Sequence, residues 1–258
     1  MHDPPVCSSA NMAIMAAINL LDTNEELDAV MVVAADSLIH EEVLDILYAS
    51  GIIASQHNRS PEHIMCPYDV SASGLVVSEG AAAIVLQKEN RSEPVQCYGG
   101  ILSAVSNCDA YSIACETNST KLRAEIIECA IAKSSLSVDD VDYINGYGSS
   151  IQCCDIHELQ ALQAVFQNRK VKCPISSSKS LLGHSFGSSA MLEILTIIAS
   201  MRQKKLIPNI NFKESSVPVE SLEFATSTRT MVNDYSLKLS FGSGNRNTAV
   251  VLCSSDVL

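Results

Sequence analysis

Apolar residues recur along the chain in two alternating patterns, one with the spacing of an amphipathic helix and one of short continuous runs typical of buried strands. Met12, Met15 and Ile18 follow the helical spacing and predict a first helix over residues 8–21. The continuous apolar run at 29–35 predicts a buried strand. Further helices are expected over 41–48, 121–132, 158–166 and 188–201, and further strands over 81–87, 99–106, 142–145, 172–175, 237–241 and 248–253. This alternation predicts an α/β layered fold.

The order of these predicted elements contains a weak internal repeat. A small-residue loop that opens a helix, followed by two strands, occurs over 7–86 and again over 184–252. The second copy follows a strand-helix-strand-helix-strand region at 99–175, whereas only six residues precede the first copy. The pattern therefore predicts two similar halves, of which the first is shorter.

The composition is that of a protein with an ordinary apolar core. Apolar residues make up 47% of the 258 residues, and there is no Trp. No stretch reaches the ~18 uninterrupted apolar residues of a membrane span, and the first residues lack the pattern of a signal peptide. The ten cysteines are dispersed, without a Cys-x2-Cys pair. We therefore expect reduced thiols, no metal site and a cytoplasmic location.

The net charge of −12 argues against a nucleic-acid partner, because nucleic acid requires a basic face. Arg202, Lys204 and Lys205 form the one obvious basic cluster in the sequence, and a solvated helix end explains it. An acidic partner protein would therefore find little basic surface on this chain.

Two segments rich in Ser and Gly carry the candidate chemistry. Lys179 and His184 lie five residues apart in such a segment, directly before the predicted helix over 188–201. Cys7 precedes the first predicted helix, where unpaired N–H groups and the helix dipole favour a thiolate. A thiolate can attack a thioester and hold the acyl group. A buried structural cysteine is the alternative, since cysteine is among the most buried residue types.

Together with a third segment at 141–158, these segments resemble β-ketoacyl synthases, the condensing enzymes of fatty-acid and polyketide assembly. The resemblance runs from Cys7 nearly to the end of the chain. It implies that Cys7 is the acyl-accepting nucleophile, that His184 contacts the thioester carbonyl and that Lys179 supports the site from behind. Tyr147 stands where the family has its other catalytic histidine.

The resemblance also assigns supporting residues. Ser149 keeps a hydroxyl where the family uses Thr to hold the pantetheine arm of the carrier, and Ile151 has lost the second such hydroxyl. Asp155 and Glu158 are expected as structural partners at the start of the helix over 158–166. Two further residues belong to a loop similar to the Gly-rich loop of the family: Phe241, expected to line the substrate pocket, and Ser243, at the gate position with a backbone N–H for the oxyanion.

The resemblance implies a thiolase-like layered α-β-α fold with an incomplete first half and a complete second half. Residues 1–95 correspond to the rear of the first half and residues 96–258 to the second half. The strand over 29–35 and the helix over 8–21 would then expose apolar faces, which soluble monomers rarely tolerate. We therefore expect a ketosynthase-like partner chain that supplies the missing front, or else a fragment.

The implied function is acyl transfer from the thioester of an acyl carrier protein to Cys7, in fatty-acid or polyketide biosynthesis. The substrate arrives on the carrier's phosphopantetheine, and no bound cofactor is expected. Condensation is doubtful because a phenol at Tyr147 donates one hydrogen bond but is not cationic near neutral pH. The alternative is a non-catalytic subunit, similar to a chain-length factor or a scaffold of a ketosynthase complex, although chain-length factors lack the cysteine.

Overall fold

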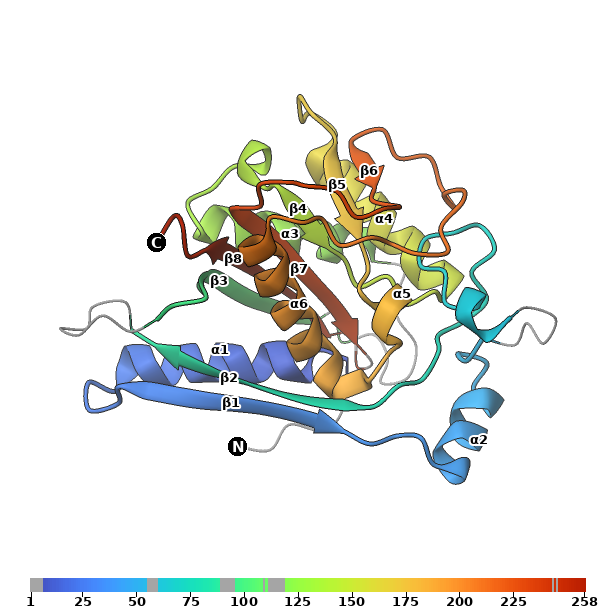
Figure 1. Cartoon of the computed structure of the whole chain (residues 1–258), viewed down its shortest axis with the longest axis horizontal. Helices are drawn as coiled ribbons and strands as arrows, with labels where there is room; N and C mark the ends of the chain where they lie inside the picture. The colour runs from blue at the N-terminus through green and yellow to red at the C-terminus, as the bar shows by residue number, and fades with distance from the viewer. Residues whose placement is uncertain are drawn as a thin grey trace.

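The computed structural model describes residues 7–54, 60–88, 96–108, 110, 119–242, 244 and 246–258. The chain forms successive layers: a two-stranded sheet, a layer of two helices, a six-stranded sheet and an outer pair of helices (Figure 1). Among the helices of these ranges, none combines the length and the apolar character that crossing a membrane requires.

The two sheets differ in size and in strand direction. The small sheet pairs β1 (Ala29–Asp36) with β2 (Gly80–Gln87) antiparallel. The large sheet has the order β3-β8-β7-β4-β5-β6, in which β8 runs antiparallel to both of its neighbours and the pairs β7–β4, β4–β5 and β5–β6 are parallel. Its strands are β3 (Gly99–Cys108), β4 (Tyr143–Asn145), β5 (Cys173–Ser176), β6 (Leu222–Phe224), β7 (Tyr235–Gly242) and β8 (Arg246–Ser254).

Two long helices fill the space between the sheets. α1 (Ser9–Thr23) contacts β1 and β3, α6 (Ser189–Gln203) contacts β2 and β7, and the two helices contact each other (Figure 1). Both helices are buried on opposite sides because each carries small or apolar residues toward both sheets. Their contribution to the core includes Ile14, Met191 and Ile194, which are at most 1% exposed.

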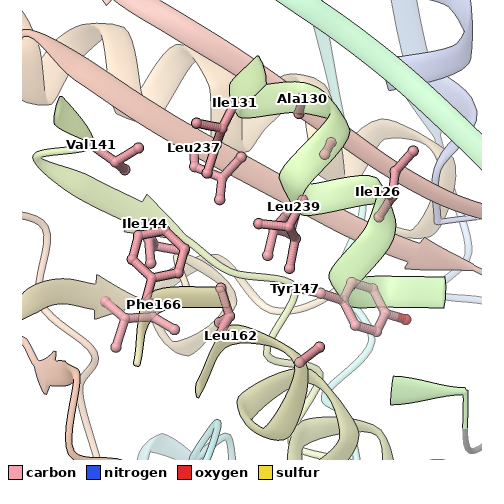
Figure 2. Packing of buried hydrophobic residues seen from close by; sticks show 14 of the residues in the cluster. Ile126, Ala130, Ile131, Val141, Ile144, Tyr147, Leu162, Phe166, Leu237 and Leu239 are labelled. Carbon is pink, nitrogen blue, oxygen red and sulfur yellow. The ribbon is translucent and has the colours of Figure 1, made fainter. Parts of the chain in front are cut away.

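The outer helices α3 (Thr120–Lys133) and α4 (Gln152–Phe166) close the other face of the large sheet. Their apolar side chains pack on Leu237 and Leu239 of β7, as Figure 2 shows for Ile126, Leu162 and Phe166. The remaining elements are the exposed helix α2 (Glu41–Ala49), the short helix α5 (Lys179–Leu182) and the 3-10 turns η1 (Pro61–His63), η2 (Val138–Asp140) and η3 (Phe186–Ser188).

The predicted helices and strands are present, with two corrections and two omissions. The helix expected over 158–166 begins earlier, at Gln152, because the first turns of α4 carry the polar residues that bind a preceding loop. The strand over 29–35, first predicted as buried, has Val32 as its one buried residue, and it exposes apolar side chains as the missing front of the first half predicted. The short strand β6 (Leu222–Phe224) and the short helix α5 (Lys179–Leu182) were not predicted from the sequence.

The internal repeat is visible in the fold. α1 and α6 each have 15 residues, and each is followed by an antiparallel strand pair, β1–β2 in one case and β7–β8 in the other. In the large sheet, the pair β7–β8 is flanked by β4 next to β7 and by β3 next to β8. Among the strands that the structure describes, β1 and β2 pair only with each other. The outer face of the small sheet exposes Met31, Val33 and Val85, with exposed fractions of 65%, 60% and 58%.

Tyr68 is the residue that fixes the segment after β4. Its ring is fully buried against Gly146 and Gly148, which flank Tyr147. A Cβ atom at position 146 would lie 2.0 Å from the Tyr68 hydroxyl oxygen, and one at position 148 would lie 2.8 Å from Tyr68 Cζ. Gly148 also has φ of +37°, a conformation that other residues rarely adopt. The two glycines therefore admit the phenol beside Tyr147.

This packing predicts a coupled pair of substitutions. Gly146→Ala should lower the free energy of unfolding by about 1–3 kcal/mol, because overpacking a filled core forces its neighbours to move. Tyr68→Phe removes the closest atom, so the double variant Gly146→Ala/Tyr68→Phe should regain part of that loss. Denaturant unfolding of the two single variants and the double variant measures the coupling. Strictly additive effects would contradict the contact.

Candidate functional site

The candidate site lies where the two central helices begin. Cys7 precedes α1 and is 7% exposed, and His184 lies fully buried in the turn before α6. Gly242 at the end of β7 packs on the first of these segments, since a Cβ there would lie 3.4 Å from the Cys7 backbone nitrogen. The structure therefore brings the start of α1 and the end of β7 together, although they are at opposite ends of the sequence.

His184 is held by the first half of the chain. Its backbone N–H donates to the carbonyl of Val76 (2.8 Å), and its carbonyl accepts from the N–H of Ser78 (3.0 Å). In the same turn, the N–H of Gly187 donates to Asp36 Oδ2 at the end of β1 (2.6 Å). The small sheet and the segment that leads into it thus position the histidine of the second half.

The hydrogen bonds of His184 fix its tautomer. Nδ1 lies 2.9 Å from the backbone N–H of Phe186, which it accepts. The proton of the neutral ring is therefore on Nε2, which lies 3.3 Å from the Tyr147 hydroxyl oxygen. Burial lowers the pKa of His184 well below its ordinary value, and the charges of Lys179 and Lys238 lower it further. His184 is therefore a neutral hydrogen-bond donor at this position.

Tyr147 lies between His184 and Phe241. Its ring meets each of the other two edge-on, with centroid distances of 5.8 and 5.9 Å. It shares a cluster of packed buried residues with Cys7, and Figure 2 shows its hydroxyl pointing away from the labelled aliphatic side chains. Lys179 Nζ donates to the Tyr147 carbonyl (2.7 Å) and lies 4.6 Å from the ring centroid. Lys179 thus contacts both the backbone carbonyl and the ring of Tyr147.

The loop that carries Tyr147 is wrapped around two carboxylates from the first turns of α4. Glu158 accepts the N–H groups of Tyr147 (2.6 Å) and Gly148 (2.9 Å). Asp155 accepts those of Ser149 (2.8 Å) and Ser150 (3.1 Å). Burial raises the pKa of both carboxyl groups, that of Asp155 to about 7, and the N–H donors oppose this shift. Four consecutive N–H groups thereby fix the loop.

Of the residues predicted to bind substrate, Ser149 and Phe241 lie in the described part of the chain, and both are buried. The Ser149 hydroxyl is fully buried and belongs to the loop itself, donating to Asp155 Oδ1 (3.3 Å) and accepting from the N–H of Ile151 (3.3 Å). Phe241 is 1% exposed and packs in the core, with the guanidinium carbon of Arg123 4.4 Å from its ring centroid. Ser243 lies outside the described residues.

A buried ionic cluster lies beside these residues and was not predicted from the sequence. Lys179 Nζ lies 2.5 Å from Glu193 Oε1, and Lys238 Nζ lies 2.6 Å from Glu193 Oε2, all three side chains being at most 1% exposed. Burial by itself raises the pKa of Glu193, but the two lysines outweigh it, so the pKa is lowered. A signal was present in the sequence, because a lysine between Leu237 and Leu239 in a predicted core strand requires a buried partner.

Two residues of the basic cluster, Arg202 and Lys204, contact neighbouring side chains. The guanidinium of Arg202 lies 4.7 Å from the Tyr98 ring centroid, and Lys204 forms an exposed ion pair with Asp256 (3.0 Å). Across the described ranges, His, Cys, Asp and Glu side chains do not gather in groups of three or more that could hold a metal ion.

Comparison with known proteins gives matches over most of the chain. The N-terminal domain of β-ketoacyl synthases matches residues 5–92, and the C-terminal domain matches residues 98–213. A 3-oxoacyl-[acyl-carrier-protein] synthase 2 of Synechocystis is 28% identical over 79% of this chain and 49% of its own length. A putative polyketide beta-ketoacyl synthase 1 of Streptomyces cyaneus is 30% identical over 77% and 47%. The chain spans about half the length of the curated relatives it matches.

Solved structures with this fold include ketosynthases. One is the complex of a type II polyketide ketosynthase with its acyl carrier protein. The match covers 99% of this chain and 63% of the matched chain, with a TM-score of 0.92 at 21% identity. Another is the ketosynthase of module 6 of the bacillaene synthase from Bacillus subtilis, with a TM-score of 0.87 at 23% identity over 96% of this chain and 45% of that one. The fold is thus the thiolase-like layered α/β fold, and the chain belongs to the β-ketoacyl synthase family.

Proposed function

We propose that this chain provides the acyl-accepting site of a ketosynthase-type condensing enzyme in fatty-acid or polyketide synthesis. The observation that carries the proposal is the contact between Tyr147 and His184, together with the place of Cys7 in the same buried cluster as Tyr147. Relatives named as synthases of both pathways support the reaction class.

The first step is thioester exchange at Cys7. The thiolate attacks the carbonyl carbon of the acyl thioester, a new C–S bond forms, and the bond to the carrier's phosphopantetheine sulfur breaks. The carrier leaves as a thiolate and takes up a proton from solvent. The start of α1 favours the attacking thiolate because the N–H groups of its first turn are directed toward the preceding residues.

The developing oxyanion requires hydrogen-bond donors in fixed positions. We assign this role to the backbone N–H groups of Cys7 and Ser243, the second of which follows the closely packed Gly242. His184 contributes its Nε2–H to the carbonyl side of the site, because its Nδ1 is occupied by the N–H of Phe186. Lys179 acts from behind, through the carbonyl of Tyr147.

We propose that Tyr147 limits the decarboxylation and condensation that follow acylation. Loss of CO2 from a malonyl group forms an enolate, which two imidazole donors would stabilise better than one imidazole and one phenol. The Tyr147 hydroxyl lies 3.3 Å from His184 Nε2, so the two groups form a hydrogen bond with each other. We therefore propose efficient acylation with slow condensation.

A non-catalytic role is the second candidate. It is favoured by the burial of Tyr147, which is 3% exposed, and by the engagement of the Ser149 hydroxyl within its own loop. Such a subunit, similar to a chain-length factor or a scaffold, would leave Cys7 unacylated. The acylation experiment therefore separates the two candidates.

Acylation at Cys7 predicts a single covalent adduct. Incubation with an acyl-carrier thioester should add one acyl mass to the protein, detected by intact-mass spectrometry. Cys7→Ala should abolish the adduct, whereas Cys129→Ala, which removes an exposed thiol of α3, should retain it. An adduct at another residue, or none even with the partner chain present, would favour the non-catalytic role.

Replacement of Tyr147 by histidine predicts a gain in decarboxylation. Tyr147→His should accelerate CO2 release from malonyl carrier protein by on the order of 10²–10³, the usual effect of one positioned donor on a developing oxyanion. Acylation of Cys7 should change little, and Tyr147→Phe should show no such gain. Radiolabelled CO2 release measures the effect. Fast condensation by the unmodified protein would show that Tyr147 does not limit the reaction.

We also propose that a ketosynthase-like chain covers the small sheet. In the large sheet the equivalent strand pair is flanked by β4 and β3 (Figure 1), so added strands would pair with the outer edges of β1 and β2. The exposed face of Met31, Val33 and Val85 supports this cover, because exposed apolar patches mark interaction sites. Acidic carrier proteins would then dock on that chain, since this one carries a net charge of −12.

The exposed face predicts poor behaviour of the chain alone. Light scattering should show self-association, which Met31→Lys/Val33→Lys should reduce while abolishing co-purification with the partner chain. Val171→Lys is the matched control, because Val171 is 71% exposed but lies between α4 and β5. A cooperative, monodisperse monomer would contradict the proposed partner.

A further inference from the structure

Phe186, two residues after His184, has a backbone conformation that is unusual for a bulky residue. Its φ is +46°, in the left-handed region that residues with a large side chain rarely adopt. Such a conformation persists only where the surrounding structure holds it. The backbone N–H of Phe186 donates to His184 Nδ1 (2.9 Å), and the two rings pack with their centroids 4.7 Å apart. The conformation of Phe186 is therefore linked to the tautomer of His184.

Asp36 holds the other side of this residue. Its Oδ2 accepts the N–H of Gly187, the peptide group that follows Phe186, at 2.6 Å. Asp36 is the last residue of β1, and the end of that strand lies at the start of α6 (Figure 1). Both N–H groups that flank the Cα atom of Phe186 are thus bound, one by His184 and one by Asp36. Together these two hydrogen bonds fix both dihedral angles of Phe186.

The carboxylate of Asp36 also stands where the helix α6 favours a negative charge. Ser188 occupies the N-cap position of α6, where a side chain ordinarily accepts an N–H of the first turn. The Ser188 hydroxyl instead donates to the carbonyl of Ser185 (3.0 Å). A carboxylate from the small sheet therefore complements the start of the helix dipole.

The backbone on the other side of His184 is closely packed. Gly183 has φ of +72°, and a Cβ atom there would lie 2.8 Å from Ser78 Cβ and 3.1 Å from the carbonyl oxygen of Val76. The same two residues bind the backbone of His184. The part of the turn that is able to relax is thus the part after His184, which Asp36 holds.

We propose that Asp36 is a positioning residue that holds Phe186 in the left-handed conformation and thereby keeps the proton of His184 on Nε2. One carboxylate of the small sheet then determines the state of a residue in the second half of the chain. The chemical meaning of that state, a hydrogen-bond donor at the acyl site, rests on the proposed function. The tautomer itself can be measured without any acyl transfer.

Nitrogen NMR on histidine-labelled protein measures the tautomer, because protonated and unprotonated ring nitrogens have well-separated shifts. The full chain is used, in its complex if folding requires it, and His184→Gln assigns the signals. Asp36→Ala should bring the two ring-nitrogen shifts of His184 closer together, since the tautomers then mix. Asp36→Asn keeps an acceptor for the N–H of Gly187 and should retain the separation seen in the parent protein. The control is Asp28→Ala, which removes an exposed carboxylate just before the other end of β1.

Phe186→Gly tests whether the effect passes through the left-handed residue. Glycine adopts positive φ without steric cost, so Asp36→Ala should change the His184 shifts less in the Phe186→Gly background than in the parent background. Asp36→Ala should also slow acylation of Cys7 by about 5–30-fold, the factor to which the cost of one left-handed residue corresponds.

Three results with folded variants would overturn the inference: an unchanged His184 in Asp36→Ala, an equal change in Asp36→Asn, or an equal effect of Asp36→Ala in the Phe186→Gly background. A parent protein with the proton of His184 on Nδ1 would overturn it without any variant. Failure of Cys7 acylation in a parent protein with the proton on Nε2 would count against the proposed function alone.

Discussion

The structure depends on the burial of α1 and α6 between two sheets. Because the small sheet covers one side of this helical layer and the large sheet the other, both helices are fixed in position and contact each other. Each is preceded by a segment that carries a candidate site residue, Cys7 in one case and His184 in the other. Packing of the apolar layer therefore fixes where these two segments lie, and the segment of His184 is held by Val76, Ser78 and Asp36 from the earlier part of the chain.

A second constraint is that polar groups inside this layered core must find partners. Asp155 and Glu158 satisfy it by accepting four consecutive N–H groups, which fixes the loop that carries Tyr147. Glu193 satisfies it by pairing with two lysines from different elements. Such networks add little net stability, but they define one arrangement of the site.

The sequence predicts the elements well where one periodicity covers a whole segment, as in α1, α6 and the pair β7–β8. It predicts the start of α4 poorly, because the first turns of that helix are polar toward the Tyr147 loop and the apolar period is apparent only from Leu159 onward. A continuous apolar run such as that of β1 does not show whether one face or both faces of the strand are buried. The exposure of Met31 could therefore not be inferred from the run itself.

The candidate site could be predicted only where its residues lie in local sequence motifs. Cys7, Lys179, His184 and Tyr147 lie in local motifs, so their residue types could be read directly. The pairing of Lys238 with Glu193 depends on strand register and helix orientation, which only the folded chain defines. Ser149 is predicted to bind the substrate, and its hydroxyl donates to Asp155 in the structure. Sequence spacing does not distinguish such a contact from an open position.

The central claim is that Cys7 is an activated nucleophile although it is almost buried. The most direct test is the rate of iodoacetamide labelling of each cysteine at neutral pH, followed by peptide mass spectrometry. Cys7 should react faster than the exposed Cys129 and Cys153, even though it is only 7% exposed. Cys173, whose pKa burial raises to about 12, supplies the inert reference. Labelling of Cys7 as slow as that of Cys173 would contradict the account.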